Sequence, residues 1–353
     1  MLGHWLGAAS LFLSPQVETP MPPRLMPNEV QRPAPLRIPR GRQTFDAREA
    51  LNGSTSSRRR CTDVPDAYWV PVRGGGACIR TYQAGSPRAG GTMLVYLPGD
   101  VLLRGRGGVR LIAGSYARRS PADIRQEMAA WSRAGGMPAI FLARPGLYGS
   151  SGNHGARRRL DEVRLVDGAL DRIKARYRAS RFILAGHSGG GHLVAALLDR
   201  RRDIAGAFIS SGLVSAAEVM RAYQKRRGPD GGPVEDPAAV YDPIAHVGGI
   251  PKPGPDIFVL SDPADRVVPF LSQRHNVERL RSAGLHPTHI LLRGEGRTRH
   301  LLAEPLKAGA ALYARGEDAA AISAALRAMA PLPPVPEEVQ NNPDVIAAYL
   351  GGE

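Results

Sequence analysis

The 353 residues of this chain are enough for one domain of about 250–300 residues with extensions, and their composition excludes a fibrous or wholly disordered protein. Lysine and arginine number 47 against 32 acidic residues, so the formal net charge at pH 7 is +15. The arginines are dispersed except for triplets at residues 58–60, 157–159 and 200–202, which are more typical of solvated surface than of a binding site. We therefore expect no nucleic-acid partner.

The first 60 residues differ in composition from the rest of the chain. They contain a short apolar segment without a preceding Lys or Arg, which makes a weak signal peptide at best. Residues 15–60 are rich in Pro, Arg and Ser and lack sustained periodicity. We interpret residues 1–60 as an extended or disordered N-terminal arm. Nowhere does the chain approach the ~18–20 consecutive apolar residues that span a bilayer, so we expect no stable membrane insertion.

Cys61 and Cys78 are the two cysteines of the chain. They lack the cysteine and histidine spacing of a zinc site, and the sequence implies neither a metal nor an organic cofactor. They bracket an expected strand at residues 68–72, and Cys78 begins the next one. Two cysteines on neighbouring strands could form a disulfide, which would imply an exported protein. A pair of reduced buried cysteines, compatible with a cytoplasmic protein, fits the sequence nearly as well.

Strand-like and helical patterns alternate along the middle of the chain. Helices are expected from Pro121, with Ser120 as N-cap, and over about residues 158–179. Strands are expected at residues 92–97, 139–143, 183–185, 205–210, 257–260 and 289–292. An insertion at residues 213–256 contains one further helical pattern. This alternation predicts an α/β domain over residues 61–330, built on a mostly parallel, three-layer sheet.

The most informative motif lies at residues 186–190, which read Gly-His-Ser-Gly-Gly and follow a short apolar run. This G-x-S-x-G pattern between a strand and a helix lifts the serine hydroxyl above the strand ends, which makes Ser188 the candidate nucleophile. It also directs the amide of Gly189 at the position where an oxyanion would form.

The alternative for this motif is a glycine-rich connection between strand and helix that has no catalytic role. A dinucleotide-binding turn fits poorly, because His192 stands where its third glycine is expected. His187 and His192 are themselves more typical of packing or surface residues.

A nucleophilic serine needs a base, and the base needs an orienting acid. The expected strand at residues 257–260 leads into Asp262 and Asp265, and the strand at 289–292 leads into a glycine-rich loop that ends at His300. The order Ser188, Asp265, His300, with Asp265 opening a D-x-x-V-P sequence, resembles the α/β-hydrolase family. The resemblance covers residues 62–315 approximately and implies the α/β-hydrolase fold. It assigns His300 as the base and prefers Asp265 over Asp262 as the acid.

The chain departs from the family pattern after the third strand of the fold. The family usually has His-Gly there, where an amide completes the oxyanion hole, whereas this chain has Pro98-Gly99-Asp100. A backbone donor can survive that change, so Gly99 and Asp100 join Gly189 as expected oxyanion-hole residues, although a carboxylate nearby would oppose an oxyanion electrostatically. The insertion at residues 213–256 is expected to form a cap over the site.

These features predict a carboxylesterase-like serine hydrolase that cleaves an ester or related acyl bond of a small-molecule substrate through an acyl-enzyme. Two alternatives stay open. The D-x-x-V-P sequence is also similar to the prolyl-oligopeptidase-like branch, which would make the protein a serine peptidase. A non-catalytic binding protein on the same scaffold is the other alternative.

Residues 331–353 form a separate segment, in which a Pro-rich linker leads into a C-terminal tail. Residues 337–353 resemble the C-terminal end of branched-chain amino-acid ABC transporter ATPases. The chain contains no G-x-x-x-x-G-K-[ST] sequence, which such an ATPase needs to bind phosphate. The resemblance of the tail therefore implies no ATPase activity.

Overall fold

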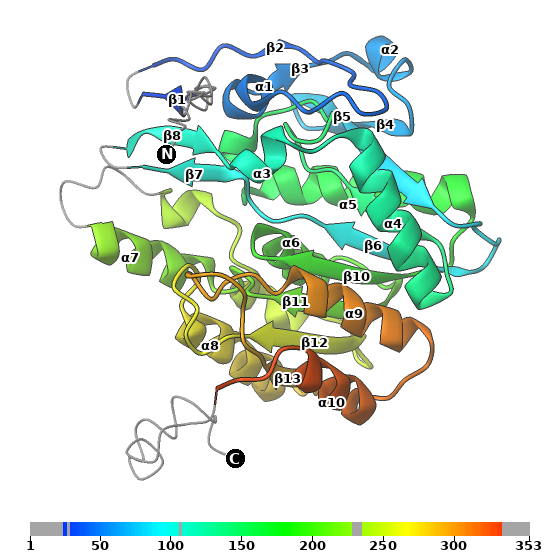
Figure 1. Cartoon of the computed structure of the whole chain (residues 1–353), viewed down its shortest axis with the longest axis vertical. Helices are drawn as coiled ribbons and strands as arrows, with labels where there is room; N and C mark the ends of the chain where they lie inside the picture. The colour runs from blue at the N-terminus through cyan, green and yellow to red at the C-terminus, as the bar shows by residue number, and fades with distance from the viewer. Residues whose placement is uncertain (1–23, 27–28, 106–107, 228–234, 334–353) are drawn as a thin grey trace, which may run out of the picture.

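The computed structural model describes residues 24–26, 29–105, 108–227 and 235–333. Within these residues, eight strands form one sheet in the order β13-β12-β11-β10-β6-β9-β5-β4 (Figure 1). The strands are β4 Ala67–Val72, β5 Gly75–Ala84, β6 Thr92–Leu97, β9 Ala139–Leu142, β10 Arg181–His187, β11 Ile204–Ser210, β12 Asp256–Ser261 and β13 Thr288–Leu291. From β9 to β13 all neighbours are parallel, whereas β5 is antiparallel to β4 and β9. The mostly parallel sheet predicted from the sequence is confirmed.

Helices cover both faces of the sheet and give the domain three layers (Figure 1). One face carries α4 (Pro121–Gly135), α9 (Ala303–Ala314) and α10 (Ala319–Met329), and the other carries α5 (Leu160–Tyr177), α6 (Gly189–Leu197) and α8 (Phe270–Ser282). Successive strand residues point to opposite faces. In β10, Phe182 and Leu184 join the core beside α5, while Ile183 and Ala185 join the core beside α4. Burial of these apolar side chains on both faces is the main term that stabilises the sheet.

Helix α4 begins and ends at the boundaries that its sequence encodes. The Ser120 hydroxyl accepts a hydrogen bond from the amide of Asp123, and the Asp123 carboxylate accepts one from the amide of Ser120, so the helix starts with a capping box. Pro121 occupies the first helical position. Gly136, with φ of 65°, ends the helix in the left-handed conformation. The helix predicted from Ser120 and Pro121 is confirmed.

The segment before residue 61 differs from the extended or disordered arm expected from its composition. Residues 29–60 contain helix α1 (Ala47–Asn52), most of helix α2 (Arg58–Cys61) and the strands β2 (Ala34–Pro35) and β3 (Ser54–Thr55). Phe45 is buried and packs its ring edge-on against Tyr82 of the sheet. These elements are too short to produce a sustained hydrophobic period, and contacts with the domain hold them in place. Residues 1–23 of the expected arm lie outside the described residues.

Two segments stand over the carboxyl edge of the parallel strands. The first follows β6 and contains β7 (Leu102–Arg104), β8 (Arg110–Ile112) and the short helix α3 (Gly114–Ala117), with β8 also paired to β1 (Arg24–Leu25). The second is the insertion after β11, which contains α7 (Ala216–Arg227). The first segment was not expected from the sequence, because its strands are only three residues long. Among the described helices, none combines the length and apolar character needed to cross a membrane.

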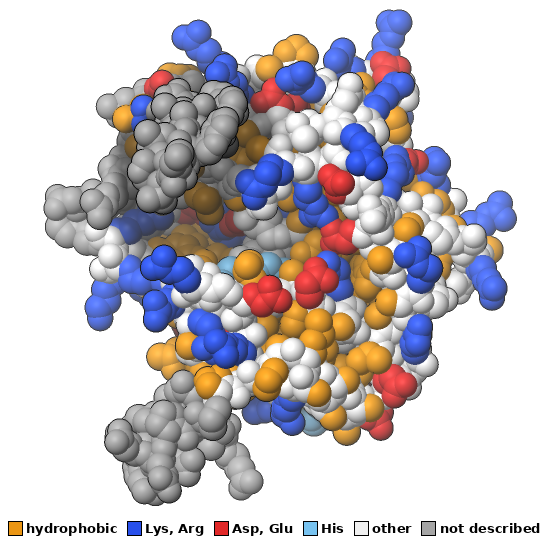
Figure 2. Space-filling model, viewed as in Figure 1, with side chains coloured by type: hydrophobic (Ala, Val, Ile, Leu, Met, Phe, Trp, Pro, Cys, Tyr) orange, Lys and Arg blue, Asp and Glu red, His pale blue; other side chains and the backbone are white. Residues whose placement is uncertain are grey.

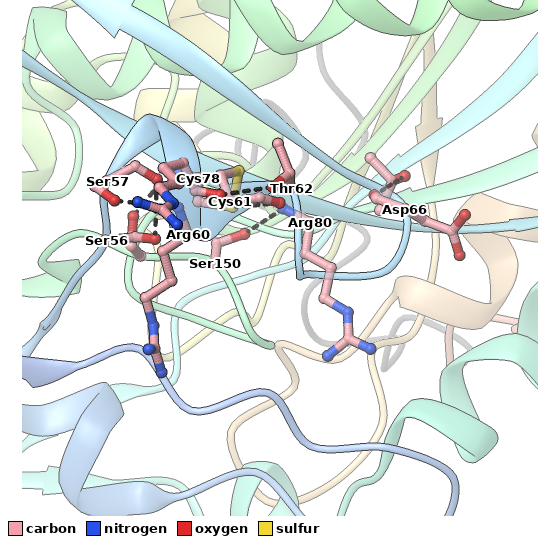
Figure 3. The surroundings of a disulfide bond; sticks show 12 residues. Ser56, Ser57, Arg60, Cys61, Thr62, Asp66, Cys78, Arg80 and Ser150 are labelled. Carbon is pink, nitrogen blue, oxygen red and sulfur yellow. Dashed lines mark hydrogen bonds between the residues drawn. A yellow bond between two sulfur atoms is a disulfide. The ribbon is translucent and has the colours of Figure 1, made fainter.

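A disulfide joins Cys61 to Cys78 (Figure 3). Cys78 lies in β5 as expected, but Cys61 ends the short helix α2 rather than a strand. Both residues are buried and form a small apolar cluster with Leu36 and Val64. The bond therefore ties the segment before residue 61 to the antiparallel edge of the sheet.

Removal of the disulfide is expected to destabilise the fold. The bond joins residues 17 positions apart, and a crosslink of that span restricts the unfolded chain by about 3 kcal/mol. The double variant Cys61→Ala, Cys78→Ala should lose about that much free energy of unfolding in a denaturant titration. Without reductant the denatured wild-type chain should show no titratable thiol, and with reductant it should show both. Two thiols titrated without reductant would contradict the bond.

Candidate active site

Ser188 stands at the sharp turn between β10 and α6, with φ of 55° and ψ of −117°. This backbone conformation is unfavourable for a residue with a Cβ atom and persists where the surrounding structure imposes it. Only glycine fits at positions 186 and 190, because a Cβ atom at either position would clash with the backbone. A Cβ on Gly186 would lie 2.2 Å from the carbonyl oxygen of Gly190, and a Cβ on Gly190 would lie 2.0 Å from that of Leu97. The strand-turn-helix setting predicted for the motif is confirmed.

The structure brings Ser188, His300 and Asp265 together at the carboxyl edge of the sheet. His300 Nε2 lies 3.0 Å from Ser188 Oγ, and His300 Nδ1 lies 2.8 Å from Asp265 Oδ2. Asp265 comes from the loop after β12, and His300 from the loop between β13 and α9. The second carboxylate oxygen of Asp265 accepts hydrogen bonds from the amides of Val267 at 2.7 Å and Val268 at 3.0 Å, which fixes the orientation of the carboxylate.

Asp262, the other carboxylate after β12, has different partners. Its side chain is fully buried, and one oxygen accepts hydrogen bonds from the amide of Gly294 at 2.7 Å and from Arg299 Nε at 2.6 Å. Gly294 and Arg299 belong to the loop that carries His300. Asp262 therefore anchors that loop, while Asp265 contacts the histidine itself.

Gly99 and Asp100 lie against the serine turn. A Cβ on Gly99 would lie 3.4 Å from Ser188 Cβ, and a Cβ on Gly189 would lie 2.1 Å from Asp100 Oδ1. The Asp100 carboxylate is held by Arg144 Nη1 at 2.6 Å, by Arg157 Nε at 3.0 Å and by Arg158. Burial alone would raise the pKa of Asp100, but these three guanidinium groups outweigh burial and hold that pKa well below its usual range. The carboxylate is therefore ionised, with its charge balanced by its neighbours.

The arginines around Asp100 form a larger ion-pair network that sequence reasoning missed. Arg144 Nε also pairs with Glu162 at 2.9 Å, and Arg157 Nη2 pairs with Glu235 at 2.7 Å. Arg157 and Arg158 are buried, which corrects the expectation that the triplet at 157–159 is solvated. Buried arginines are tolerated because carboxylates compensate their charge. The partners lie far apart in the sequence, so no local pattern predicts the network. The one sequence signal was the position of Arg144, two residues after the end of β9 and therefore at the carboxyl edge of the sheet.

Asp100→Asn is expected to destabilise the protein at neutral pH. The substitution leaves Arg144, Arg157 and Arg158 without one of their carboxylates, and breaking a buried ion pair in this way costs about 3–5 kcal/mol. Because folding depresses the pKa of Asp100, its contribution is complete above the pKa of the unfolded chain, about 4, and is lost as the pH falls through the folded-state pKa.

The measurement is the free energy of unfolding of wild type and variant at pH 7 and at pH 3. The difference should be large at pH 7 and smaller at pH 3. Asp161→Asn provides the matched control, because Asp161 forms an exposed pair with Arg164 that contributes about 0.5 kcal/mol or less. Equal stability of Asp100→Asn and Asp161→Asn at pH 7 would contradict the role of the network.

The two histidines beside the serine are packed rings. His187 Nδ1 lies 3.0 Å from Ser210 Oγ, and burial together with the neighbouring His300 lowers the pKa of His187 to about 3. His192 Nε2 donates a hydrogen bond to the carbonyl oxygen of Tyr241 at 2.7 Å, and burial lowers the pKa of His192 as well. Both rings are neutral at physiological pH, in agreement with the packing role expected for them.

A cavity of about 570 Å³ opens above Ser188 and His300. Figure 2 shows the hollow on this face, with hydrophobic and histidine side chains visible inside it and basic side chains around it. The two segments over the carboxyl edge supply much of its wall. The apolar lining includes Leu102, Leu103, Leu213, Met220, Val267 and Leu301. The charged lining consists of Arg104, Arg157, Arg158, Arg226, Arg227 and Arg266, with the acidic residues Asp100 and Glu235.

The strand order, the antiparallel edge and the serine turn define an α/β-hydrolase fold. Est1E from Butyrivibrio proteoclasticus, in a structure with ferulic acid bound, has this fold at a TM-score of 0.50 and 14% identity, with 71% of this chain and 98% of that chain covered. A puromycin hydrolase matches at a TM-score of 0.49 and 14% identity, covering 72% of this chain and 40% of the other. At these identities the likeness concerns the fold alone.

Pyrococcus horikoshii acylaminoacyl peptidase matches at a TM-score of 0.48 and 10% identity, over 72% of this chain and 43% of the peptidase. This chain thus spans less than half the length of that protein.

No curated protein matches the chain by sequence. Residues 335–353 match a family described as branched-chain amino acid ATP-binding cassette transporter, which confirms the resemblance of the tail. Those residues lie outside the part of the chain that the structure describes.

Proposed function

We propose that this protein is a serine hydrolase that cleaves an ester or related acyl bond of a small molecule. The observation that supports the proposal most directly is the pair of short contacts from His300 to Ser188 Oγ, 3.0 Å, and to Asp265, 2.8 Å. In this arrangement the Ser188 hydroxyl donates to His300 Nε2, and His300 Nδ1–H donates to Asp265. The carboxylate then holds the imidazole in the tautomer that can accept the serine proton.

The proposed reaction has two steps. Ser188 Oγ bonds to the acyl carbon as its proton passes to His300 Nε2. The bond from that carbon to the alcohol oxygen then breaks, and the alcohol leaves with the proton from Nε2. Water next attacks the acyl-enzyme, gives its proton to His300, and releases the acid as that proton returns to Ser188 Oγ. The first step removes the Ser188 proton with the alcohol, and the second step restores it from water. The site therefore returns to its starting charge and proton count after both steps, and water is the only co-reactant.

The oxyanion of each tetrahedral intermediate needs preorganised donors. We assign this role to the amide of Gly189, the first residue of α6, and to the backbone at Gly99 and Asp100. The Asp100 carboxylate would oppose an oxyanion if it were unpaired. Its contacts with Arg144, Arg157 and Arg158 balance that charge, which supports the assignment. In this proposal residues 61–330 form the hydrolase domain and residues 213–256 its cap.

A panel of substrates tests the kind of bond that is cleaved. p-Nitrophenyl esters of increasing acyl chain length are compared with p-nitroanilides of single amino acids at equal concentration. We expect hydrolysis of the esters, with the anilides turned over far more slowly. Faster hydrolysis of the anilides would favour a serine peptidase instead. A folded protein that cleaves neither class would favour a binding protein on the same scaffold.

A further inference from the structure

The cavity above Ser188 has an excess of positive charge. Among the described residues that line it, six are arginine and two are acidic, so positive charges exceed negative charges by four. A cleft lined by one sign of charge raises the local concentration of ligands with the opposite sign. The chain as a whole is also basic, with a net charge of +15, which adds to the attraction of anions.

Four of the six arginines form two pairs that differ in their surroundings. Arg157 and Arg158 have carboxylate partners in Asp100 and Glu235 and are buried. Arg226 and Arg266 are exposed, and within the described residues no carboxylate forms an ion pair with either of them. Among the described residues, carboxylates therefore balance the charges of Arg157 and Arg158, whereas none balances those of Arg226 and Arg266.

Arg226 is also held in place without losing its charge. Its Nη2 donates a hydrogen bond to the carbonyl oxygen of Val267 at 2.7 Å, its Nη1 donates to that of Arg266, and its guanidinium lies 5.0 Å from the ring centre of Tyr223. Carbonyl oxygens and an aromatic ring orient a guanidinium but do not neutralise it. Arg266 directly follows Asp265, whose carboxylate contacts His300, so both arginines lie on the histidine side of the site.

Apolar surface lies beside these charges. Leu103 and Leu301 line the cavity, and each is 51% exposed. Leu213 and Met220 line it more deeply and are buried. A ligand that fits such a lining has an apolar part and an anionic part. Figure 2 shows the same combination of hydrophobic and basic side chains around the hollow.

We propose that the substrate is an ester that carries a carboxylate, with its apolar part against Leu103, Leu213 and Met220 and its carboxylate held by Arg226 and Arg266. A guanidinium matches a carboxylate because two parallel N–H groups can donate to its two oxygens. This inference rests on the proposed serine hydrolase function and names the substrate class of the same site.

The test compares esters that differ in one charge. On the acyl side, the p-nitrophenyl monoester of adipic acid is compared with the p-nitrophenyl ester of adipic acid monoamide, which has the same size and no charge. On the alcohol side, 4-acetoxyphenylacetic acid is compared with its primary amide. In at least one of the two pairs, wild type should show kcat/KM about tenfold higher for the carboxylate, and added salt should reduce this preference.

Variants then locate the anion site. Arg226→Gln and Arg266→Gln should each reduce the ratio of kcat/KM between carboxylate and amide, and the double variant should remove most of it. Arg221→Gln is the matched control, because Arg221 is an exposed arginine of α7 outside the cavity lining, and it should keep the wild-type ratio. Melting temperatures of all variants verify that each is folded.

The outcomes separate the two proposals. Hydrolysis of carboxylate and amide esters at equal rates in both pairs would overturn the carboxylate inference and leave the hydrolase function standing. A preference that is unchanged in the double variant would overturn the assignment to Arg226 and Arg266. No hydrolysis of any ester, together with a Ser188 that does not react with a fluorophosphonate, would overturn the hydrolase function and the inference with it.

Discussion

Replacement of Ser188 by alanine is expected to reduce the turnover of a p-nitrophenyl ester by about 10⁴–10⁶-fold, the range seen when a member of a Ser-His-Asp set is removed. The variant lacks the oxygen that lies 3.0 Å from His300 Nε2 and that would form the acyl-enzyme. The fold should persist, because alanine fits the space of serine and the turn is imposed by the close contacts at Gly186 and Gly190. Turnover and melting temperature are measured on the same preparations.

Ser323→Ala is the matched control for this loss. Ser323 lies in α10, where its hydroxyl donates to the carbonyl oxygen of Ala319, away from the serine turn. We expect the control to keep the turnover of wild type. A folded Ser188→Ala variant with turnover within a few fold of wild type would mean that the turn has a structural role.

Asp265→Asn is expected to reduce turnover by up to about 10⁴-fold. An asparagine amide can donate to His300 Nδ1, and the imidazole would then hold its proton on Nε2, facing the serine, where it cannot act as a base. Stability should change little. The asparagine oxygen can still accept the hydrogen bonds from the amides of Val267 and Val268. Steady-state kinetics and a thermal melt give the two quantities.

The variant Asp262→Asn tests whether Asp265 or Asp262 is the carboxylate that orients His300. Asp262 is fully buried and bonds Arg299 and Gly294, so its substitution should mainly lower the melting temperature and weaken the loop that carries His300. Asp265→Asn should lower turnover without that loss of stability. Near-normal turnover in Asp265→Asn beside an inactive Asp262→Asn would reverse the assignment.

The sequence predicted the parts of the fold that local patterns determine. Continuous apolar runs such as residues 92–97 mark strands buried on both faces, and Ser120 with Pro121 marks the start of a helix, because these signals depend on residues close together in the chain. The segment at residues 29–60 could not be predicted in this way. Its helices and strands are short, and it is held by burial of residues such as Phe45 against distant parts of the domain.

In the candidate site, too, the residues with local sequence signals could be predicted, whereas contacts between distant segments could not. The turn at Ser188 has a local signature, and the D-x-x-V-P sequence separated Asp265 from Asp262, so these residues could be selected from the sequence. The balance of charge around Asp100 could not. It depends on Arg144 and Arg157, whose contacts with Asp100 form when separate loops meet at the sheet edge. From the sequence alone, the Asp100 carboxylate near Gly189 was expected to oppose an oxyanion. In the structure, Arg144, Arg157 and Arg158 balance the charge of that carboxylate.

The most direct test of the proposed function is covalent labelling with a fluorophosphonate, followed by mass spectrometry of the modified peptide. Such a reagent reacts with a serine whose hydroxyl is activated by a neighbouring base. We predict one label in wild type, on Ser188, and none in Ser188→Ala. Labelling of another residue that persists in Ser188→Ala, or a folded wild type that takes no label and hydrolyses no ester, would contradict the assignment of Ser188 as the nucleophile.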